Sequence, residues 1–138
     1  MAMPNHERMS IVDTAWLRMD GPGHSMMIVG VSATETPVRP ADFRRMIEQR
    51  LLCFTRFRQR PRADALGASW IEDDEFDLDA HVRTVSLPKP AGKAQLEKLT
   101  AELASTPLDP RRPMWQFHLV ERYNGGSAWI MRVHHCYA

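Results

Sequence analysis

The sequence predicts an α/β protein of the α+β kind, in which helices pack on a mixed sheet. Three observations support this fold class. Two segments carry apolar residues at helical spacing, several short segments have the composition or alternation of strands, and Asn124-Gly125 marks a tight hairpin. At 138 residues, 43% of them hydrophobic, the chain is long enough for one domain with its own core.

The N-terminal part predicts a tail, a cap and a first strand. Residues 1–8 are polar and unpatterned, so we expect a disordered tail or an expression remnant. Ser10-Ile11-Val12-Asp13 has the spacing of a capping box ahead of a short helical turn. Gly21-Pro22-Gly23 indicates a turn, with His24 as a solvated histidine at its edge, and residues 26–33 form a buried-strand candidate.

Two helices are predicted by apolar spacing. The first begins near Pro40, because proline suits the first helical turn. Its apolar face is formed by Phe43, Met46, Ile47, Leu51 and Phe54. The second follows Gly92, with Leu96, Leu99 and Leu103 on one face, and ends before Pro107. Both helices should pack on the sheet.

The segment between the helices is charged. Arg56, Arg58, Arg60 and Arg62 predict the solvent-facing edge of a strand, although they could also guide phosphate groups. Six of the eight residues from Glu72 to Asp79 are acidic, without the glycine-containing spacing of a calcium loop, and predict a solvated loop between two short strands. His81 follows and is interpreted as structural, because no reactive partner lies nearby in the sequence.

The last strands lead to a pair of histidines. Residues 116–121 alternate as a half-buried strand does, and residues 128–133 return after the hairpin to His134 and His135. Strand alternation places His135 on the face of Trp129, Met131 and Val133, and His134 on the other face. An imidazole can take a proton from a hydroxyl and return it to a leaving group. By itself, however, such a pair is more often structural.

Composition narrows the possible partners and location. The chain has 18 Lys and Arg against 17 Asp and Glu, so there is no excess of positive charge to indicate nucleic-acid binding. Two cysteines, Cys53 and Cys136, and the absence of a signal-like N-terminus favour the cytoplasm. No apolar run approaches the roughly 20 residues of a membrane span, so membrane contact would be peripheral. Cys136 does not indicate zinc, because no second ligand cluster has the required spacing.

Several segments, in order, resemble one enzyme family. Residues 132–138 resemble the start of the His-His-x-x-x-Asp-Gly signature shared by CoA-dependent acyltransferases and peptide-synthetase condensation domains. Residues 10–17 resemble the Ser-Pro-x-Asp-x-x-Phe-Leu opening of the bacterial wax ester synthase/acyl-CoA:diacylglycerol acyltransferase family, with Ile11 and Trp16 replacing proline and phenylalanine. Residues 70–82 and 107–115 resemble that family's Trp-x-x-Asp-x-x-Phe-Asp-Leu-x-x-His-Val and Pro-Leu-Asp-x-x-Arg-Pro-Leu-Trp elements.

The resemblance implies a fold and a site. Residues 9–138 would form the N-terminal lobe of a two-lobed fold like that of chloramphenicol acetyltransferase, and this chain lacks the C-terminal lobe and the aspartate of the signature. The family's substrates, acyl-CoA and a long-chain alcohol or diacylglycerol, enter a tunnel between the lobes. His135 would be the general base and His134 would hold the geometry, with no metal and no cofactor apart from acyl-CoA as substrate. Peripheral contact with membranes or lipid inclusions fits such substrates.

Three alternatives stay open. A condensation domain would use the same histidine on an amine acceptor. The chain could be a non-catalytic lobe that contacts lipids or another protein. It could also be one piece of a nicked protein, held by its missing C-terminal lobe. Under the resemblance, residues 1–138 alone should be inactive.

Overall fold

The computed structural model describes residues 6–23 and 25–137 and confirms the α+β fold class. Its helices are α1 (Ile11–Met19), α2 (Pro40–Arg50) and α3 (Lys93–Ala104), with the 3₁₀ helices η1 (Thr55–Arg58), η2 (Leu78–Ala80) and η3 (His135–Tyr137). Its strands are β1 (His6–Arg8), β2 (Met27–Thr34), β3 (Gln59–Asp64), β4 (Gly67–Glu72), β5 (Val82–Val85), β6 (Trp115–Tyr123) and β7 (Gly126–His134).

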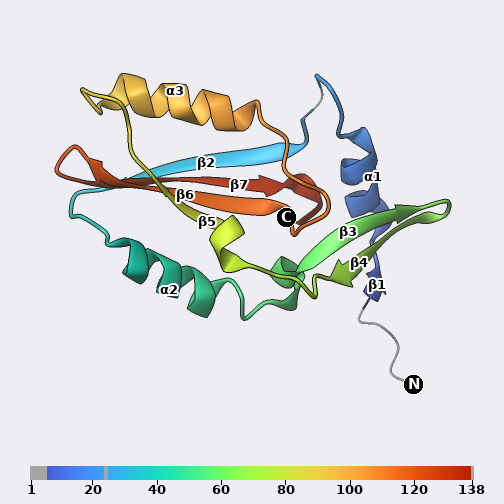
Figure 1. The fold of residues 1–138 in the computed structure, drawn as a ribbon. Helices are drawn as coiled ribbons and strands as arrows, with labels where there is room; N and C mark the ends of the chain where they lie inside the picture. Colours follow the sequence, from blue (N-terminus) through green and yellow to red (C-terminus); the bar gives the residue numbers. More distant parts are fainter. Residues whose placement is uncertain (1–5, 24, 138) are drawn as a thin grey trace.

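The larger sheet has four strands in the order β2-β7-β6-β5. β5 runs parallel to β6, whereas the other pairs are antiparallel, so the sheet is mixed as predicted. Helix α3 covers one face and α2 lies on the opposite side (Figure 1). The central strands β7 and β6 are therefore enclosed by strands at their edges and by helices above and below.

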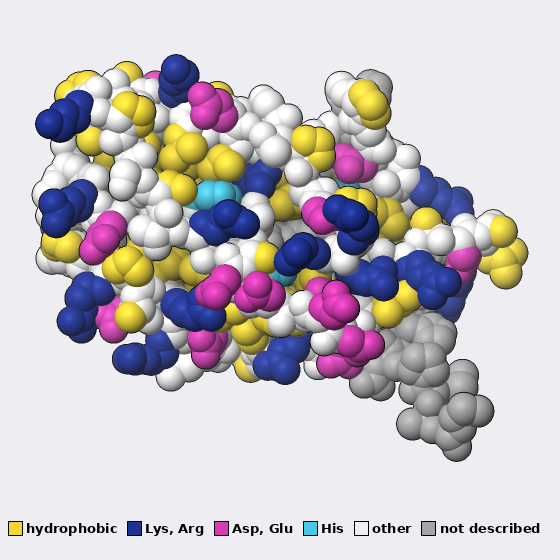
Figure 2. Space-filling view, viewed as in Figure 1, with side chains coloured by type: hydrophobic (Ala, Val, Ile, Leu, Met, Phe, Trp, Pro, Cys, Tyr) yellow, Lys and Arg dark blue, Asp and Glu magenta, His cyan; other side chains and the backbone are white. Residues whose placement is uncertain are grey.

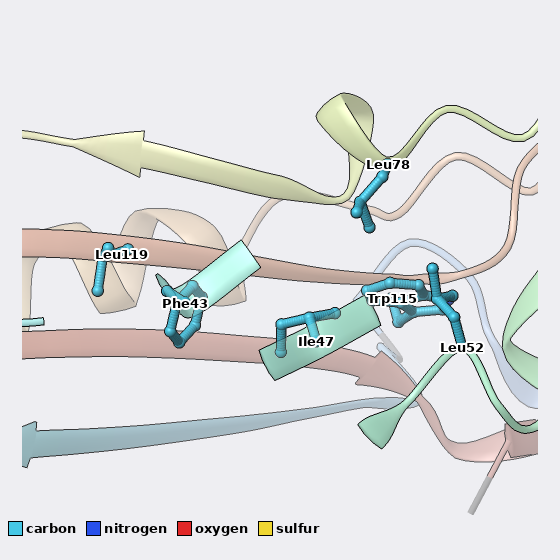
Figure 3. Packing of buried hydrophobic residues seen from close by; sticks show 6 residues of the cluster. All are labelled: Phe43, Ile47, Leu52, Leu78, Trp115 and Leu119. Atoms are coloured by element: carbon cyan, nitrogen blue, oxygen red, sulfur yellow. The ribbon is translucent and has the colours of Figure 1, made fainter. Parts of the chain in front are cut away.

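The two faces of this sheet carry separate cores. On the α2 side, Phe43 and Ile47 of α2 point toward Trp115 and Leu119 of β6 (Figure 3). On the α3 side, Leu96 packs with residues of the neighbouring strands. Leu119 and Val120, consecutive in β6, are each 1% exposed. The predicted half-buried strand is therefore wrong, because helices cover both faces.

Helix α2 packs as predicted over only part of its length. Phe43 and Ile47 are buried, whereas Met46 and Phe54 are 37% and 59% exposed. The helix ends at Arg50, so Phe54 lies beyond it and does not continue the apolar face. The two buried positions are one helical turn apart, which is sufficient for a single line of contact with β6.

The smaller sheet is antiparallel, with the order β1-β4-β3. β3 is its edge strand, as the arginine-rich segment predicted. β1 pairs with β4, and Arg8 forms an ion pair with Asp64 at 2.6 Å. The tail predicted over residues 1–8 is therefore wrong for residues 6–8, whose backbone extends this sheet, whereas residues 1–5 lie outside the described residues.

Helix α1 connects the smaller sheet to the end of β7. The Ser10 side chain accepts a hydrogen bond from the backbone N–H of Asp13 at 3.1 Å, as the capping spacing predicted. Trp16 and Leu17 then pack against a cluster that includes Trp70 of β4 and Cys136 of η3. α1 is thus fixed at the place where the histidine pair leaves the sheet.

One face of the molecule carries charges of both signs, with hydrophobic side chains between them (Figure 2). This distribution agrees with the formal net charge of +1. Among the described residues, no helix has both the length and the apolarity to cross a membrane.

The hairpin between β6 and β7 is a two-residue turn at Asn124-Gly125. Both residues have positive φ, 54° and 81°, as this tight hairpin requires. Gly126 begins β7 beside the end of β2, and a Cβ placed there would lie 1.9 Å from the carbonyl oxygen of Thr34. The β2–β7 pairing therefore depends on the absence of a side chain at Gly126.

We expect Gly126→Ala to lower the free energy of unfolding by more than about 2 kcal/mol, because backbone atoms of β2 must move. Gly21→Ala is the control, since a Cβ there meets no atom within 4 Å. Urea unfolding of both variants measures the difference. Equal stability of the two variants would contradict the close approach.

We expect the free energy of unfolding to depend on pH because of His118 in β6. The residue is 6% exposed, and burial, together with the charges of Arg132 and Arg83, lowers its pKa to about 4. Because the unfolded-state pKa is near 6.5, protonation favours unfolding. Titration of His118 therefore leaves the free energy of unfolding unchanged above about pH 6.5 and lowers it as the pH falls from about 6.5 toward 4.

Between pH 7.5 and 4.5 this group should remove about 2 kcal/mol from the free energy of unfolding. His118→Phe should flatten that dependence, as measured by urea unfolding at the two pH values. An unchanged slope in the variant would show that His118 does not contribute to it.

Candidate active site

The histidine pair, His134 and His135, lies where the central strand of the larger sheet ends. β7 is hydrogen-bonded to β2 on one side and to β6 on the other. The strand ends at His134, and His135 begins η3. His135 therefore lies beyond the strand, and its place on the face of Trp129, Met131 and Val133 stays a prediction, because alternation requires an extended backbone.

His134 joins the end of the strand to the turn that follows it. The residue is 1% exposed, and its Nδ1 accepts a hydrogen bond from the backbone N–H of Cys136 at 3.0 Å. An Nδ1 that accepts carries no proton, so the hydrogen of the neutral ring is on Nε2. Nε2 lies 3.6 Å from Oδ2 of Asp20, the residue after α1. The ring therefore connects the loop after α1 with η3.

The electrostatics of His134 suit this role. Burial lowers its pKa, the carboxylate of Asp20 acts in the opposite direction, and the neighbouring His135 lowers it further. The ring is therefore neutral near pH 7 and keeps Nδ1 free to accept the Cys136 N–H. Asp20 is held in turn, because its Oδ1 accepts the backbone N–H of Met26 at 2.8 Å.

His135 is half-buried and held from two directions. Its backbone N–H donates to the carbonyl oxygen of Met26 at 2.8 Å. Its imidazole stacks on the indole of Trp16, with 4.5 Å between ring centroids and 18° between the planes. Stacking occupies one face of the ring, and no hydrogen bond joins either ring nitrogen to the described residues.

A cavity of about 600 Å³ lies beside His134. Met27, Leu108 and Met114 contribute apolar wall, and Asp20 and His134 contribute polar groups. Apolar walls with a few placed polar groups are typical of sites for small organic ligands. His134 rather than His135 faces this cavity.

The two residues after the pair anchor the turn. Burial raises the pKa of the Cys136 thiol to about 12, so the thiol is neutral and not a nucleophile. The Tyr137 hydroxyl accepts the backbone N–H of Met114 at 3.0 Å and donates to the carbonyl oxygen of Gln59 at 2.7 Å. η3 is thereby tied to both sheets.

The remaining sequence candidates lie elsewhere. His81 is 2% exposed, its Nδ1 hydrogen bonds to the carbonyl oxygen of Trp115 at 2.7 Å, and its ring stacks on Phe76 and Trp115. Burial lowers its pKa, in agreement with the structural role predicted for it. Arg56 lies over the Trp70 ring at 4.3 Å and pairs with Glu7. His24 lies outside the described residues.

Comparison with known proteins identifies the family. A profile of the wax ester synthase/diacylglycerol acyltransferase catalytic domain matches residues 9–138. The chain belongs to this family. A Mycobacterium tuberculosis protein named as a candidate diacylglycerol O-acyltransferase is 36% identical over 140 residues, which cover 95% of this chain and 30% of the relative. A second M. tuberculosis protein named for the same activity is 45% identical over 78 residues, covering 54% of this chain and 29% of that protein.

Solved structures share the fold. The wax ester synthase/diacylglycerol acyltransferase from Marinobacter aquaeolei VT8 aligns with a TM-score of 0.78 and 24% identity over 95% of this chain and 33% of its own. A mutant form of the starter condensation domain of rhizomide synthetase aligns with a TM-score of 0.77 and 17% identity over 96% of this chain and 33% of its own. This chain therefore spans about a third of the length of the proteins that it matches.

Two partners of the histidine pair were not identified as such from the sequence. Asp20 stands before the Gly21-Pro22 turn, where a carboxylate is expected on the surface, and nothing local indicates that it faces His134. Trp16 replaces the phenylalanine of the family's opening element. This match was the one signal in the sequence that the position could belong to the site. The contact of Trp16 with His135 spans more than a hundred residues of chain and required the folded structure.

We expect His134→Ala to lower the free energy of unfolding by about 2–4 kcal/mol, because it leaves a buried N–H of Cys136 without its acceptor and opens a cavity. Chemical denaturation measures this loss. Cys53→Ala, at an exposed cysteine, is the control and should leave stability nearly unchanged. A wild-type denaturation curve for His134→Ala would contradict the structural role.

Proposed function

We propose that the protein containing this chain is an acyl-CoA-dependent O-acyltransferase, with a long-chain alcohol or diacylglycerol as acceptor. The observation that carries the proposal is the His135 imidazole, held at the end of β7 in a chain of the wax ester synthase/diacylglycerol acyltransferase family. The product is a wax ester or a triacylglycerol, released with free CoA.

His135 acts as the general base in this proposal. A nitrogen at the ring edge takes the proton of the acceptor hydroxyl, and the oxygen attacks the carbonyl carbon of the thioester. The carbon–sulfur bond then breaks, and the imidazolium returns the proton to the departing CoA thiolate. Imidazole suits both steps because its ordinary pKa is near neutrality.

His134 and Asp20 position this base without reacting. The hydrogen bond from Cys136 to His134 holds the first turn of η3. Asp20 lies with Oδ2 3.6 Å from Nε2 of His134, and its Oδ1 accepts the Met26 N–H. Met26 in turn accepts the His135 N–H. Each link in this chain of contacts restricts the position of the base, and precise positioning contributes strongly to rate.

The substrate class is supported by the relatives. The curated relatives are named for diacylglycerol O-acyltransfer, and one solved neighbour, the rhizomide starter condensation domain, is described in complex with C8-CoA. The cavity beside His134, to whose lining His135 does not belong, has apolar walls that suit an apolar ligand. The proposal includes no metal and no cofactor other than acyl-CoA as substrate. Because the acceptors are lipids, it also includes peripheral contact with a membrane or lipid inclusion from the cytoplasm.

The site requires more protein than residues 1–138. These residues cover 30% of the first curated relative. We therefore expect the other wall of the substrate tunnel to come from a second lobe, and residues 1–138 alone to release no CoA thiol. A condensation-type transfer to an amine is the second candidate, favoured by the fold match alone. Turnover of free acyl-CoA with an alcohol, without a carrier protein, would separate the two.

We expect His135→Ala in the complete enzyme to lower acyl transfer by about 10²–10⁴-fold, because the base is lost. CoA-thiol release from a long-chain acyl-CoA plus a fatty alcohol or diacylglycerol measures this. His135→Gln is the matched variant: it keeps a polar side chain without a base and should be equally inactive. Near-normal thiol release by either variant would overturn the assignment.

A further inference from the structure

The indole of Trp16 is the aromatic surface against which the candidate base lies. The rings are nearly parallel, at 18°, with centroids 4.5 Å apart. The contact joins α1 to η3, two elements separated by most of the chain. A parallel stack restrains rotation of the imidazole about its Cβ–Cγ bond. Its two nitrogens lie at the edge of the ring and are not covered by the stacked face.

Trp16 is itself fixed in place. The Ser10 cap and the hydrogen bond from the Thr14 hydroxyl to the Ser10 carbonyl oxygen, at 2.7 Å, order the first turn of α1. Ile11, Val12 and Met19 of this helix are 89%, 66% and 55% exposed. The side of α1 that docks on the protein is therefore the side of Trp16 and Leu17, which pack with Met9, Ala68, Trp70 and Cys136.

The chemistry of the stack favours one protonation state. The negative face of an indole attracts a cation held over it, and tryptophan does so more strongly than phenylalanine or tyrosine. In the proposed reaction His135 becomes a cation when it removes the hydroxyl proton. An aromatic face that stabilises this cation acts in the transition state, where the charge develops, more than in the neutral ground state.

We infer that Trp16 is a positioning residue for the transfer reaction, holding the His135 ring and stabilising the imidazolium formed during proton transfer. The inference rests on the proposed function, since it requires His135 to be the base. Trp16 stands at the phenylalanine position of the family's opening element. The inference gives this position a role in catalysis as well as in packing.

The test compares three variants of the complete enzyme in the CoA-thiol release assay. Trp16→Leu removes the aromatic face and should lower kcat roughly tenfold with little change in KM, because the indole stacks on the base and is not part of the lining of the cavity beside His134. Trp16→Phe keeps an aromatic face and should retain most of kcat. Leu17→Ala is the matched packing control, since it loosens the same cluster without removing the stack and should lower the melting temperature more than kcat.

A double-mutant cycle separates catalysis from folding. In the His135→Ala background, Trp16→Leu should have no further effect on the residual rate, whereas a purely structural role would lower the rate in both backgrounds. Equal kcat for wild type and Trp16→Leu, or equal losses in Trp16→Leu and Trp16→Phe, would overturn the inference while leaving His135 as the base. Full activity of His135→Ala would overturn both proposals.

Discussion

The hydrogen bonding of β7 on both edges is the constraint on which the rest of the structure depends. β2 pairs with it from Ser127 to His134 and β6 pairs with it from Ala128 to Val133, and helices cover both of its faces. A strand enclosed in this way has no freedom to slip, because a shift of one residue would exchange its two buried faces. The position of its last residue, His134, is therefore fixed by the sheet.

Buried polar groups transmit that position into the turn. Arg132, 4% exposed, donates to the carbonyl oxygens of Leu103 and Thr106 and so joins the end of α3 to β7. His134 accepts the N–H of Cys136, and the Tyr137 hydroxyl bridges the two sheets. Each of these groups would be costly to bury without a partner. The contacts of His134 and Tyr137 also tie η3 to its neighbours.

The two histidines therefore differ in environment although they are adjacent. His134 is enclosed, neutral and engaged at Nδ1, whereas His135 is half-buried, stacked on Trp16 and free at its ring edge. The division of roles expected from the family resemblance stays a prediction, and the two environments are compatible with it. The difference in environment follows from the change of backbone from strand to 3₁₀ helix between the two residues and not from strand alternation.

Local patterns in the sequence determined the elements: the Ser10 cap, the helices after Pro40 and Gly92, the Asn124-Gly125 hairpin and the strands beside it. These depend on interactions between near neighbours, and such interactions are readable from spacing and residue type. The family resemblance added the identity of the histidine pair. Only the tertiary structure decided that β6 is buried on both faces, that residues 6–8 extend a sheet, and that Asp20 and Trp16 meet the histidines. Those outcomes depend on which distant segments pack together. The spacing of residues within one segment does not show which other segment it will contact.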